Sequence, residues 1–267
     1  MSVGTVSPPP PEETRSAAPA LTKGFAILDL IANEPGLGFA AIRKRLGLPN
    51  SSCHHLVSTL CQLGALTMRR DRGYVLGLRL FELGSMASNL RQIERQALPP
   101  LRKLADEVRL TCHLGVREGH AAIYLVKVEG QHEIRVNTWI GKRLSLHSSS
   151  LGKVLLAWLP EAELDDTLRA IAWTRNGPNT ITDPARFREH LAGVRARGWA
   201  FDDEEDLANI RCVAAPVMDV EGRVIAAISA VGTVLDIGAD RFERLARQMT
   251  AAAQEISYEI GHRSVTP

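Results

Sequence analysis

Apolar residues recur at spacings of three and four in three successive segments near the N-terminus, which predicts three short helices. The stripes are Leu21, Phe25, Leu28 and Ile31; Phe39, Ile42 and Leu46; and Cys53, Leu56, Val57, Leu60 and Leu63. Pro35-Gly36 and Gly47 end the first two helices. Asn50 and Ser51 are expected to cap the third helix with their side chains.

The third helix has an outer face that is polar and free of acidic residues. This face comprises Ser51, His54, His55, Ser58 and Gln62. A solvated helix ordinarily mixes Glu and Lys, whereas a helix in the DNA major groove avoids carboxylates and carries short hydrogen-bonding groups. A predicted hairpin follows, with Asp71-Arg72-Gly73 at its turn and Arg69 and Arg70 beside it. This order is typical of a winged helix-turn-helix; the alternative is a three-helix packing module.

Later in the chain the pattern changes to short β-rich runs separated by turns. Strands are predicted at 113–116, 121–128, 134–140, 199–201, 212–218 and 224–231. Helices are predicted at 150–159, 161–171 and 185–197, with a last one carrying Phe242, Leu245, Met249 and Ile256 on its apolar side. Strands, then helices, then strands and a helix indicate an α+β fold. We expect an antiparallel sheet with its helices grouped on one face.

A helix-prone segment from Leu78 to Leu90 joins the two parts, and Pro99-Pro100 is expected to start a further helix that runs to Val108. From its residues alone, the joining segment is interpreted as a rigid spacer. Residues 1–20 contain five of the 14 prolines, which predicts a disordered tail.

The chain has 267 residues and a net charge of +2, but the charge is unevenly distributed. Residues 21–92 contain nine Lys or Arg and four Asp or Glu, a net charge of +5, whereas residues 93–267 carry −2. A basic N-terminal part suggests a polyanionic partner for that part alone. We expect neither a secretory signal nor a membrane span, because no apolar run approaches about 18 residues. The four cysteines form no CxxC pair, and we expect free thiols in a reducing cytoplasm.

Three serines, Ser148 to Ser150, precede an apolar helix. They either cap that helix or help its free amides to hold a carboxylate. Cys212 and Ser229 interrupt apolar strands and are either core residues or ligand-facing ones, because a buried hydroxyl needs a partner.

The competing hypothesis is an enzyme on the same scaffold. Ser150-Leu151-Gly152-Lys153 matches S-x-x-K, in which a lysine can act as base for a serine, but the accompanying S-D-N and K-T-G motifs are absent. Cys212 has no nearby second cysteine to resolve a redox intermediate. His54 and His55 point about 100° apart on a helix and have no third ligand nearby, which disfavours a metal site. We therefore expect no catalytic residue, no cofactor and no metal.

The chain resembles the IclR family of bacterial transcriptional regulators. The resemblance rests on Ala20-Leu21-x-Lys23-Gly24-Phe25, Gly47-Leu48-Pro49-x-Ser51-Ser52-x-His54, Gly141-x-Arg143-Leu144, Leu151-Gly152-Lys153, Arg197-Gly198-Trp199-Ala200 and Arg211-Cys212-Val213-Ala214-Ala215-Pro216. It implies a winged helix-turn-helix at 21–77, a linker helix at 78–92 and a GAF-like effector-binding domain at 93–263. It also implies a homodimer or homotetramer on double-stranded operator DNA.

The DNA-binding candidates combine this resemblance with the polar helix face and the basic hairpin. They are Lys23, Ser51, Ser52, His54, His55, Ser58, Arg69, Arg70 and Arg72. The family often has Arg where this chain has His55, so a contact there would be weaker and sensitive to pH.

The resemblance also implies a pocket for a small organic or aromatic acid. It falls on Val136, Leu144, Ser150, Leu151, Asp202, Cys212, Ser229 and Val231. Some relatives that bind small keto acids place a hydroxyl where Val231 sits, so its loss favours a ligand with more apolar surface. A carboxylate at Asp202 repels an anionic ligand, and we expect it to bind a ligand hydroxyl or to hold its own loop.

Overall fold

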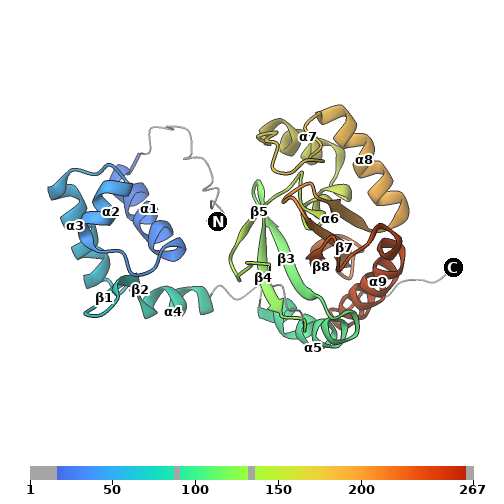
Figure 1. Cartoon of the computed structure of the whole chain (residues 1–267), viewed down its shortest axis with the longest axis horizontal. Coiled ribbons are helices and arrows are strands. Elements are labelled where there is room, and N and C mark those ends of the chain that lie inside the picture. The colour runs from blue at the N-terminus through green and yellow to red at the C-terminus, as the bar shows by residue number, and fades with distance from the viewer. Residues whose placement is uncertain (1–16, 87–90, 132–135, 263–267) are drawn as a thin grey trace. The chain divides into compact units, whose positions relative to one another are not determined.

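The computed structural model describes residues 17–86, 91–131 and 136–262 (Figure 1). The chain divides between Ser88 and Asn89 into two compact units. Within these described stretches, none of the helices combines the length and apolarity needed to cross a membrane. The predicted tail lies largely outside them, and the first helix begins at Pro19, a residue whose fixed φ suits a helix start.

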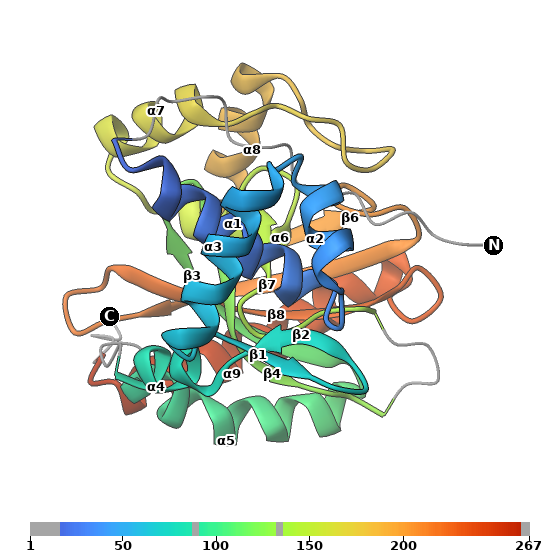
Figure 2. The same ribbon diagram turned by 90° about the vertical axis from the view of Figure 1, so that its left-hand side faces the viewer.

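The N-terminal unit packs three helices against a small hairpin, and Figure 2 looks onto this unit. Its elements are α1 (Pro19–Asn33), α2 (Phe39–Arg45), α3 (Asn50–Gln62), β1 (Leu66–Arg69), β2 (Gly73–Leu76) and α4 (Leu78–Met86). Ile27, Ile31, Ile42, Cys53 and Val57 form the centre of its core. Leu37 bridges to Tyr74 of β2 and thereby holds the hairpin to the segment before α2. This confirms the predicted order of helices and hairpin.

Part of the predicted apolar stripes faces solvent. Leu21, Phe25 and Leu63 are 63%, 59% and 64% exposed. The buried side of α1 runs through Gly24, Ile27, Leu28 and Ile31, so the predicted stripe is confirmed for Leu28 and Ile31 and wrong for its first two members. The capping prediction for α3 was also wrong, because Pro49 stands at its N-cap and no side chain bonds to the first amides.

The second unit is built on a six-stranded antiparallel sheet. Its strands are β3 (Thr111–Glu118), β4 (Ala121–Val128), β5 (Arg143–Ser145), β6 (Ala200–Asp203), β7 (Ile210–Met218) and β8 (Val224–Thr233), in the spatial order β5-β4-β3-β8-β7-β6. The predicted strand at 134–140 is not observed over 136–140, and residues 132–135 lie outside the described part. Instead, β5 pairs with β4 and forms the edge of the sheet on that side.

Helices cover both faces of this sheet, which corrects the expectation of one covered face (Figure 1). One face packs against α5 (Arg91–Val108) and α9 (Phe242–Glu259). A short 3-10 helix, η2 (Ala239–Arg241), directly precedes α9. The other packs against α6 (Ser150–Ala157), α7 (Glu161–Ala170) and α8 (Pro184–Arg197). The reason is visible in β8, where residues 226–232 are buried without alternation, as expected for a strand covered on both sides.

Helix α5 runs through Pro99-Pro100 rather than starting there. Proline lacks an amide hydrogen and normally ends a helix at this point. Here Ile93, Ala97, Leu101 and Leu104 place one continuous apolar face in the core, and this burial outweighs the local cost. The predicted linker helix 78–92 therefore corresponds to α4 and the first two residues of α5, with 87–90 outside the described part.

Helix α6 approaches the preceding loop closely because residue 152 is glycine. A Cβ on Gly152 would lie 2.5 Å from the Leu146 Cα and 2.6 Å from its carbonyl oxygen. Both neighbours are backbone atoms, so they cannot move aside cheaply. The helix start is thereby fixed against the loop that carries Ser148 and Ser149.

Gly152→Ala is expected to lower the free energy of unfolding by at least about 2 kcal/mol, because overpacking against backbone forces a local shift. Gly193→Ala in α8 is the matched control, since its nearest neighbour is the flexible Arg197 guanidinium at 3.6 Å. That change should instead stabilise by up to about 1 kcal/mol through helix propensity. Urea unfolding of both variants measures the difference, and equal effects would contradict the close approach of α6.

Candidate functional site

Helix α3 presents its polar face to solvent, as predicted. Ser51, His54 and His55 are exposed, and Ser52 and Ser58 are half-buried. The opposite side of the helix is anchored by Cys53 and Val57. The His54 ring packs edge-on against Phe39 of α2, with ring centroids 6.2 Å apart. The face therefore offers hydroxyl and imidazole groups and no carboxylate.

Basic side chains flank this face on neighbouring elements. Arg69, Arg70 and Arg72 are exposed around the hairpin turn, and Arg72 contacts the adjacent Asp71 carboxylate at 3.2 Å. Lys23 is exposed on α1. Sequence reasoning missed Arg43 and Lys44, which stand exposed in the last turn of α2, although their position in the first helix of a helix-turn-helix was a usable signal.

A second group of polar residues lies on the α6-facing side of the sheet, where hydrogen-bonded register brings them into rows. Thr111, Val231, Cys212 and Asp202 face one another across β3, β8, β7 and β6. The next row holds His113, Ser229, Ala214 and Ala200 on the same strands. Successive rows on one face are two residues apart, so all eight side chains share that face.

The start of α6 sits over this face. Its N-cap Ser149 accepts a hydrogen bond from the Gly152 amide at 3.1 Å, which confirms the capping function of the serine run. The Leu151 side chain lies 3.0 Å from where a Cβ on Gly115 would stand, so it packs directly on β3. Helix geometry leaves the first amides of α6, including those of Ser150 and Leu151, without intrahelical acceptors. They can therefore hold an anion.

Further polar side chains lie next to these rows and the start of α6. Together with the polar residues already described they form a set that we call the polar cluster. It comprises His113, Tyr124, Ser148, Ser150, Asp202, Asp206, Cys212 and Ser229. The Ser148 hydroxyl donates to Asp206, and the Asn176 amide donates to Ser148 at 3.0 Å. Burial raises the pKa of Tyr124, and the proximity of Cys212, Asp206 and Asp202 raises this pKa further.

Asp202 holds its own loop, one of the two roles expected for it. Its Oδ1 accepts the amides of Glu205 at 2.7 Å and Asp206 at 3.3 Å. Burial and the neighbouring Asp206 raise the pKa of Asp202 to about 8. A protonated Asp202 removes the repulsion that an anionic ligand would otherwise meet.

Lys153 of α6 is fully buried and tied to the loop after β6. Its Nζ contacts the Glu205 carboxylate and donates to the Phe201 carbonyl at 2.9 Å. Burial lowers the pKa of the Lys153 ammonium, and the adjacent carboxylate acts in the opposite direction. Both contacts occupy the amine, which would otherwise be the base in the S-x-x-K hypothesis.

The structure brings most of the ligand-site predictions together. Six of them are buried, namely Leu144, Ser150, Leu151, Asp202, Ser229 and Val231, and Cys212 is half-buried. Val136 is half-buried in a segment without regular structure, not in a strand. Sequence reasoning missed His113, Tyr124, Ser148 and Asp206, and only Ser148 carried a signal, as part of the serine run.

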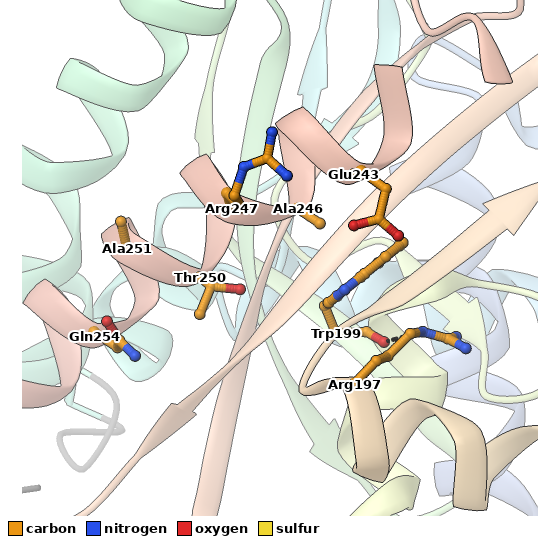
Figure 3. Close-up of a pocket in the computed structure, with 8 residues that line it drawn as sticks. All are labelled: Arg197, Trp199, Glu243, Ala246, Arg247, Thr250, Ala251 and Gln254. Carbon is orange, nitrogen blue, oxygen red and sulfur yellow. Dashed lines mark hydrogen bonds between the residues drawn. The ribbon is translucent and has the colours of Figure 1, made fainter. Parts of the chain in front are cut away.

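A separate pocket of about 300 Å³ lies between the α8–β6 junction and α9. Figure 3 shows Arg197 and Trp199 from that junction together with Glu243, Arg247, Thr250 and Gln254 from α9. The Arg197 guanidinium stacks on both Trp199 and Phe201, 5.0 Å from each ring centroid. No predicted site residue lines this pocket, so it is distinct from the polar cluster.

All four cysteines are free thiols. Within residues 17–86, 91–131 and 136–262, no three His, Cys, Asp or Glu side chains gather in a way that could hold a metal ion. Burial and Asp202 raise the pKa of Cys212, which keeps this thiol protonated and poorly nucleophilic.

Residues 86–258 match the family profile of the bacterial transcriptional regulator IclR C-terminal domain, and residues 20–70 match the IclR helix-turn-helix domain. The chain is 39% identical over 249 residues to the HTH-type transcriptional regulator RhmR of Escherichia coli, covering 93% of this chain and 96% of that protein. It is 32% identical to the E. coli transcriptional repressor IclR, covering 91% and 90% of the two chains. A solved IclR homologue of Microbacterium hydrocarbonoxydans complexed with 4-hydroxybenzoate is similar with a TM-score of 0.79 and 28% identity, covering 90% of this chain and 98% of that one.

Asp202→Asn is expected to change the pH dependence of stability. Because the pKa of Asp202 is raised in the folded chain, its contribution is present at low pH and is lost as the pH rises towards 8. The free energy of unfolding of the Asn variant should therefore rise relative to that of the wild type between pH 5 and pH 9. Urea unfolding at both pH values measures this, with Asp106→Asn on the exposed side of α5 as control. A constant difference would contradict the raised pKa.

Proposed function

The chain belongs to the IclR family of bacterial transcriptional regulators, and on that basis we propose that its operator contacts come from the polar face of α3 and the basic hairpin. The family membership makes it a DNA-binding regulator with an N-terminal helix-turn-helix domain and a C-terminal effector-binding domain. The observation that carries the proposal is the solvent-facing side of α3, which combines short polar groups with the absence of any acid. Such a face fits a groove lined by phosphates.

In this proposal the contacts divide into two kinds. Ser51, Ser52, His54, His55 and Ser58 read base edges, because hydroxyl and imidazole groups can form directional hydrogen bonds there. Phosphates are bound by the surrounding basic side chains, which are Lys23, Arg43, Lys44, Arg69, Arg70 and Arg72. Phosphate contacts fix the position on the duplex and carry the salt dependence, whereas the base contacts carry the sequence preference.

We propose that the protein acts as a homodimer or homotetramer. One winged helix reads few base pairs, so paired half-sites are needed for specificity. Large apolar side chains on the N-terminal unit support a protein partner, since Leu21, Phe25, Leu78 and Phe81 are 59–71% exposed. Exposed apolar groups of this size are unfavourable in water unless a partner covers them.

The effector in this proposal is a small organic or aromatic acid at the polar cluster. The first amides of α6 receive its carboxylate, and Cys212, Ser229 and the protonated Asp202 bind its remaining polar groups. Leu144 and Val231 contribute apolar wall, and Val136 completes the site by resemblance. The ligand favours one arrangement of the protomers and so changes the spacing of the two α3 helices. The coupling required is of the usual size, about 1–3 kcal/mol.

The proposal includes no catalytic step, and it places the protein in the cytoplasm. Engagement of the Lys153 amine by Glu205 and Phe201 speaks against acyl transfer through Ser150. A cytoplasmic location follows from the DNA target and agrees with four free thiols. We keep the division into a DNA-reading part at 21–77, a connector at 78–92 and a sensing part at 93–263.

The DNA contacts are tested with a fragment from the region upstream of the gene and random DNA of equal length. Arg72→Ala should weaken binding to both DNAs alike and reduce the slope of log K against log salt by about one. Ser51→Ala and His54→Ala should weaken binding to the upstream fragment by about 1–3 kcal/mol and leave random DNA nearly unaffected. Arg169→Ala, an exposed residue of α7, is the control. Wild-type protein that shows no preference for the upstream fragment at low salt would overturn the proposal, and two chains per bound fragment would support the dimer.

The effector site is tested by thermal shift with pyruvate, glyoxylate, benzoate and 4-hydroxybenzoate. Ser229→Leu should abolish any shift seen in the wild type, because the larger side chain fills the site, while DNA binding without ligand persists. Ser229→Ala serves as the milder variant, and Ser257→Ala in α9, equally buried at 3% exposure, should retain the shift. Normal shifts in both Ser229 variants would place the ligand elsewhere.

A further inference from the structure

His113 is buried at the centre of the polar cluster. It lies on β3 with a side-chain exposure of 0%, directly opposite Ser229 of β8 in the ladder. Its ring stacks on Tyr124 with centroids 4.0 Å apart and an interplanar angle of 17°. Two residues further along the same face, Leu151 at the start of α6 packs on Gly115. The imidazole therefore lies on the α6-facing side of β3, flanked by the strands that carry Ser229 and Tyr124 and next to the contact between Leu151 and Gly115.

One ring nitrogen of His113 is engaged and the other is not. Nε2 lies 2.9 Å from the Thr138 hydroxyl. Nδ1 is buried and has no hydrogen-bond partner among the described residues. Burial, together with Lys127 and Lys142, lowers the pKa of His113 to about 3, so the ring is neutral. A buried polar atom without a protein partner is unfavourable, so this nitrogen favours a polar group of a bound molecule beside it.

We propose that His113 is a specificity-determining residue whose Nδ1 binds a hydroxyl group of the effector, so that the effector is a hydroxylated carboxylic acid. The inference rests on the proposed effector site and deepens it. The carboxylate lies at the first amides of α6, and the hydroxyl reaches the row of His113 and Ser229. Val231, one row away, still provides an apolar wall for the carbon skeleton.

A hydroxyl is favoured over other polar groups because of the two tautomers of a neutral imidazole. If Nε2 carries the hydrogen and donates to Thr138, Nδ1 must receive a hydrogen bond. If the Thr138 hydroxyl donates to Nε2, Nδ1 carries the hydrogen and must donate. A hydroxyl both donates and accepts, so it satisfies either tautomer, whereas a ketone, an ether or a second carboxylate satisfies only the second.

The experiment compares matched acids that differ in hydroxylation: 4-hydroxybenzoate with benzoate, lactate with propionate, and gluconate with hexanoate. Affinities are measured by calorimetry or thermal shift on the full chain. We expect at least one hydroxylated acid to bind the wild type about ten- to a hundred-fold more tightly than its partner, because the acid without the hydroxyl leaves Nδ1 unpaired.

Two substitutions separate the ring nitrogens. In His113→Asn the amide lies near the position of Nδ1, and in His113→Gln it lies near that of Nε2. The Asn variant should therefore retain the preference for the hydroxylated acid, and the Gln variant should reduce it to about threefold or less. DNA binding without ligand and a cooperative melting transition show that each variant is folded. If the Asn variant does not fold, the Gln variant decides alone: loss of the preference supports the proposal, and its retention overturns it.

The outcomes also distinguish this inference from the proposed function. Acids that bind the wild type without regard to hydroxylation would overturn the role of His113 and leave the acid-binding site in place. Equal loss or equal retention of the preference in the Asn and Gln variants would likewise overturn it. If pyruvate or glyoxylate binds and none of the six acids does, the inference is overturned and the acid-binding site stands. If none of these eight acids binds, the organic-acid effector is itself contradicted, and the inference falls with it.

Discussion

The buried ion pair between Lys153 and Glu205 is the interaction on which the ligand-binding part depends. It joins the middle of α6 to the loop after β6, and the Phe201 carbonyl completes the coordination of the ammonium. Removing either partner would leave an isolated charge in the interior, at a cost of about 3–5 kcal/mol. The pair thereby fixes the first amides of α6 next to Asp202 and Asp206, which no local preference of either segment would do. This attachment holds the start of α6 beside those members of the polar cluster that lie on the sheet.

In the N-terminal unit, α3 is held in place although one of its sides faces solvent. Cys53 and Val57 of α3 are fully buried, and Leu56, Leu60 and Cys61 pack partly buried against the same core, so the helix is held along one side. The hairpin is anchored in turn by the bridge between Leu37 and Tyr74. Because α3 packs along one side only, its polar side and the basic side chains around it remain exposed to a partner of opposite charge.

Periodicity sufficed to predict most elements, and its failures have physical causes. Leu21 and Phe25 lie at helical spacing yet face solvent, because spacing defines a stripe but not which neighbour covers it. Pro99-Pro100 is a local signal that tertiary burial overrides in α5. The sequence of β8 lacks the alternation of polar and apolar residues that a strand covered on one side shows, and the expectation of one covered face overlooked this signal. Of the site, the resemblance supplied residues such as Asp202 and Ser229. His113 and Tyr124 joined them only through strand register, which one sequence does not reveal.

The paired prolines in α5 have a mechanical consequence. Proline at 99 and 100 removes the amides that would have bonded to the carbonyls of Arg95 and Gln96, one turn earlier. The helix thus lacks two main-chain hydrogen bonds at this turn, which lowers its resistance to bending there. Its first half is kept in line by the burial of Ile93 and Ala97 and by the Gln96 amide, which donates to the Glu259 carbonyl at the end of α9 at 2.8 Å. The direction of the first half of α5 therefore depends on its side-chain contacts with the core and with the end of α9.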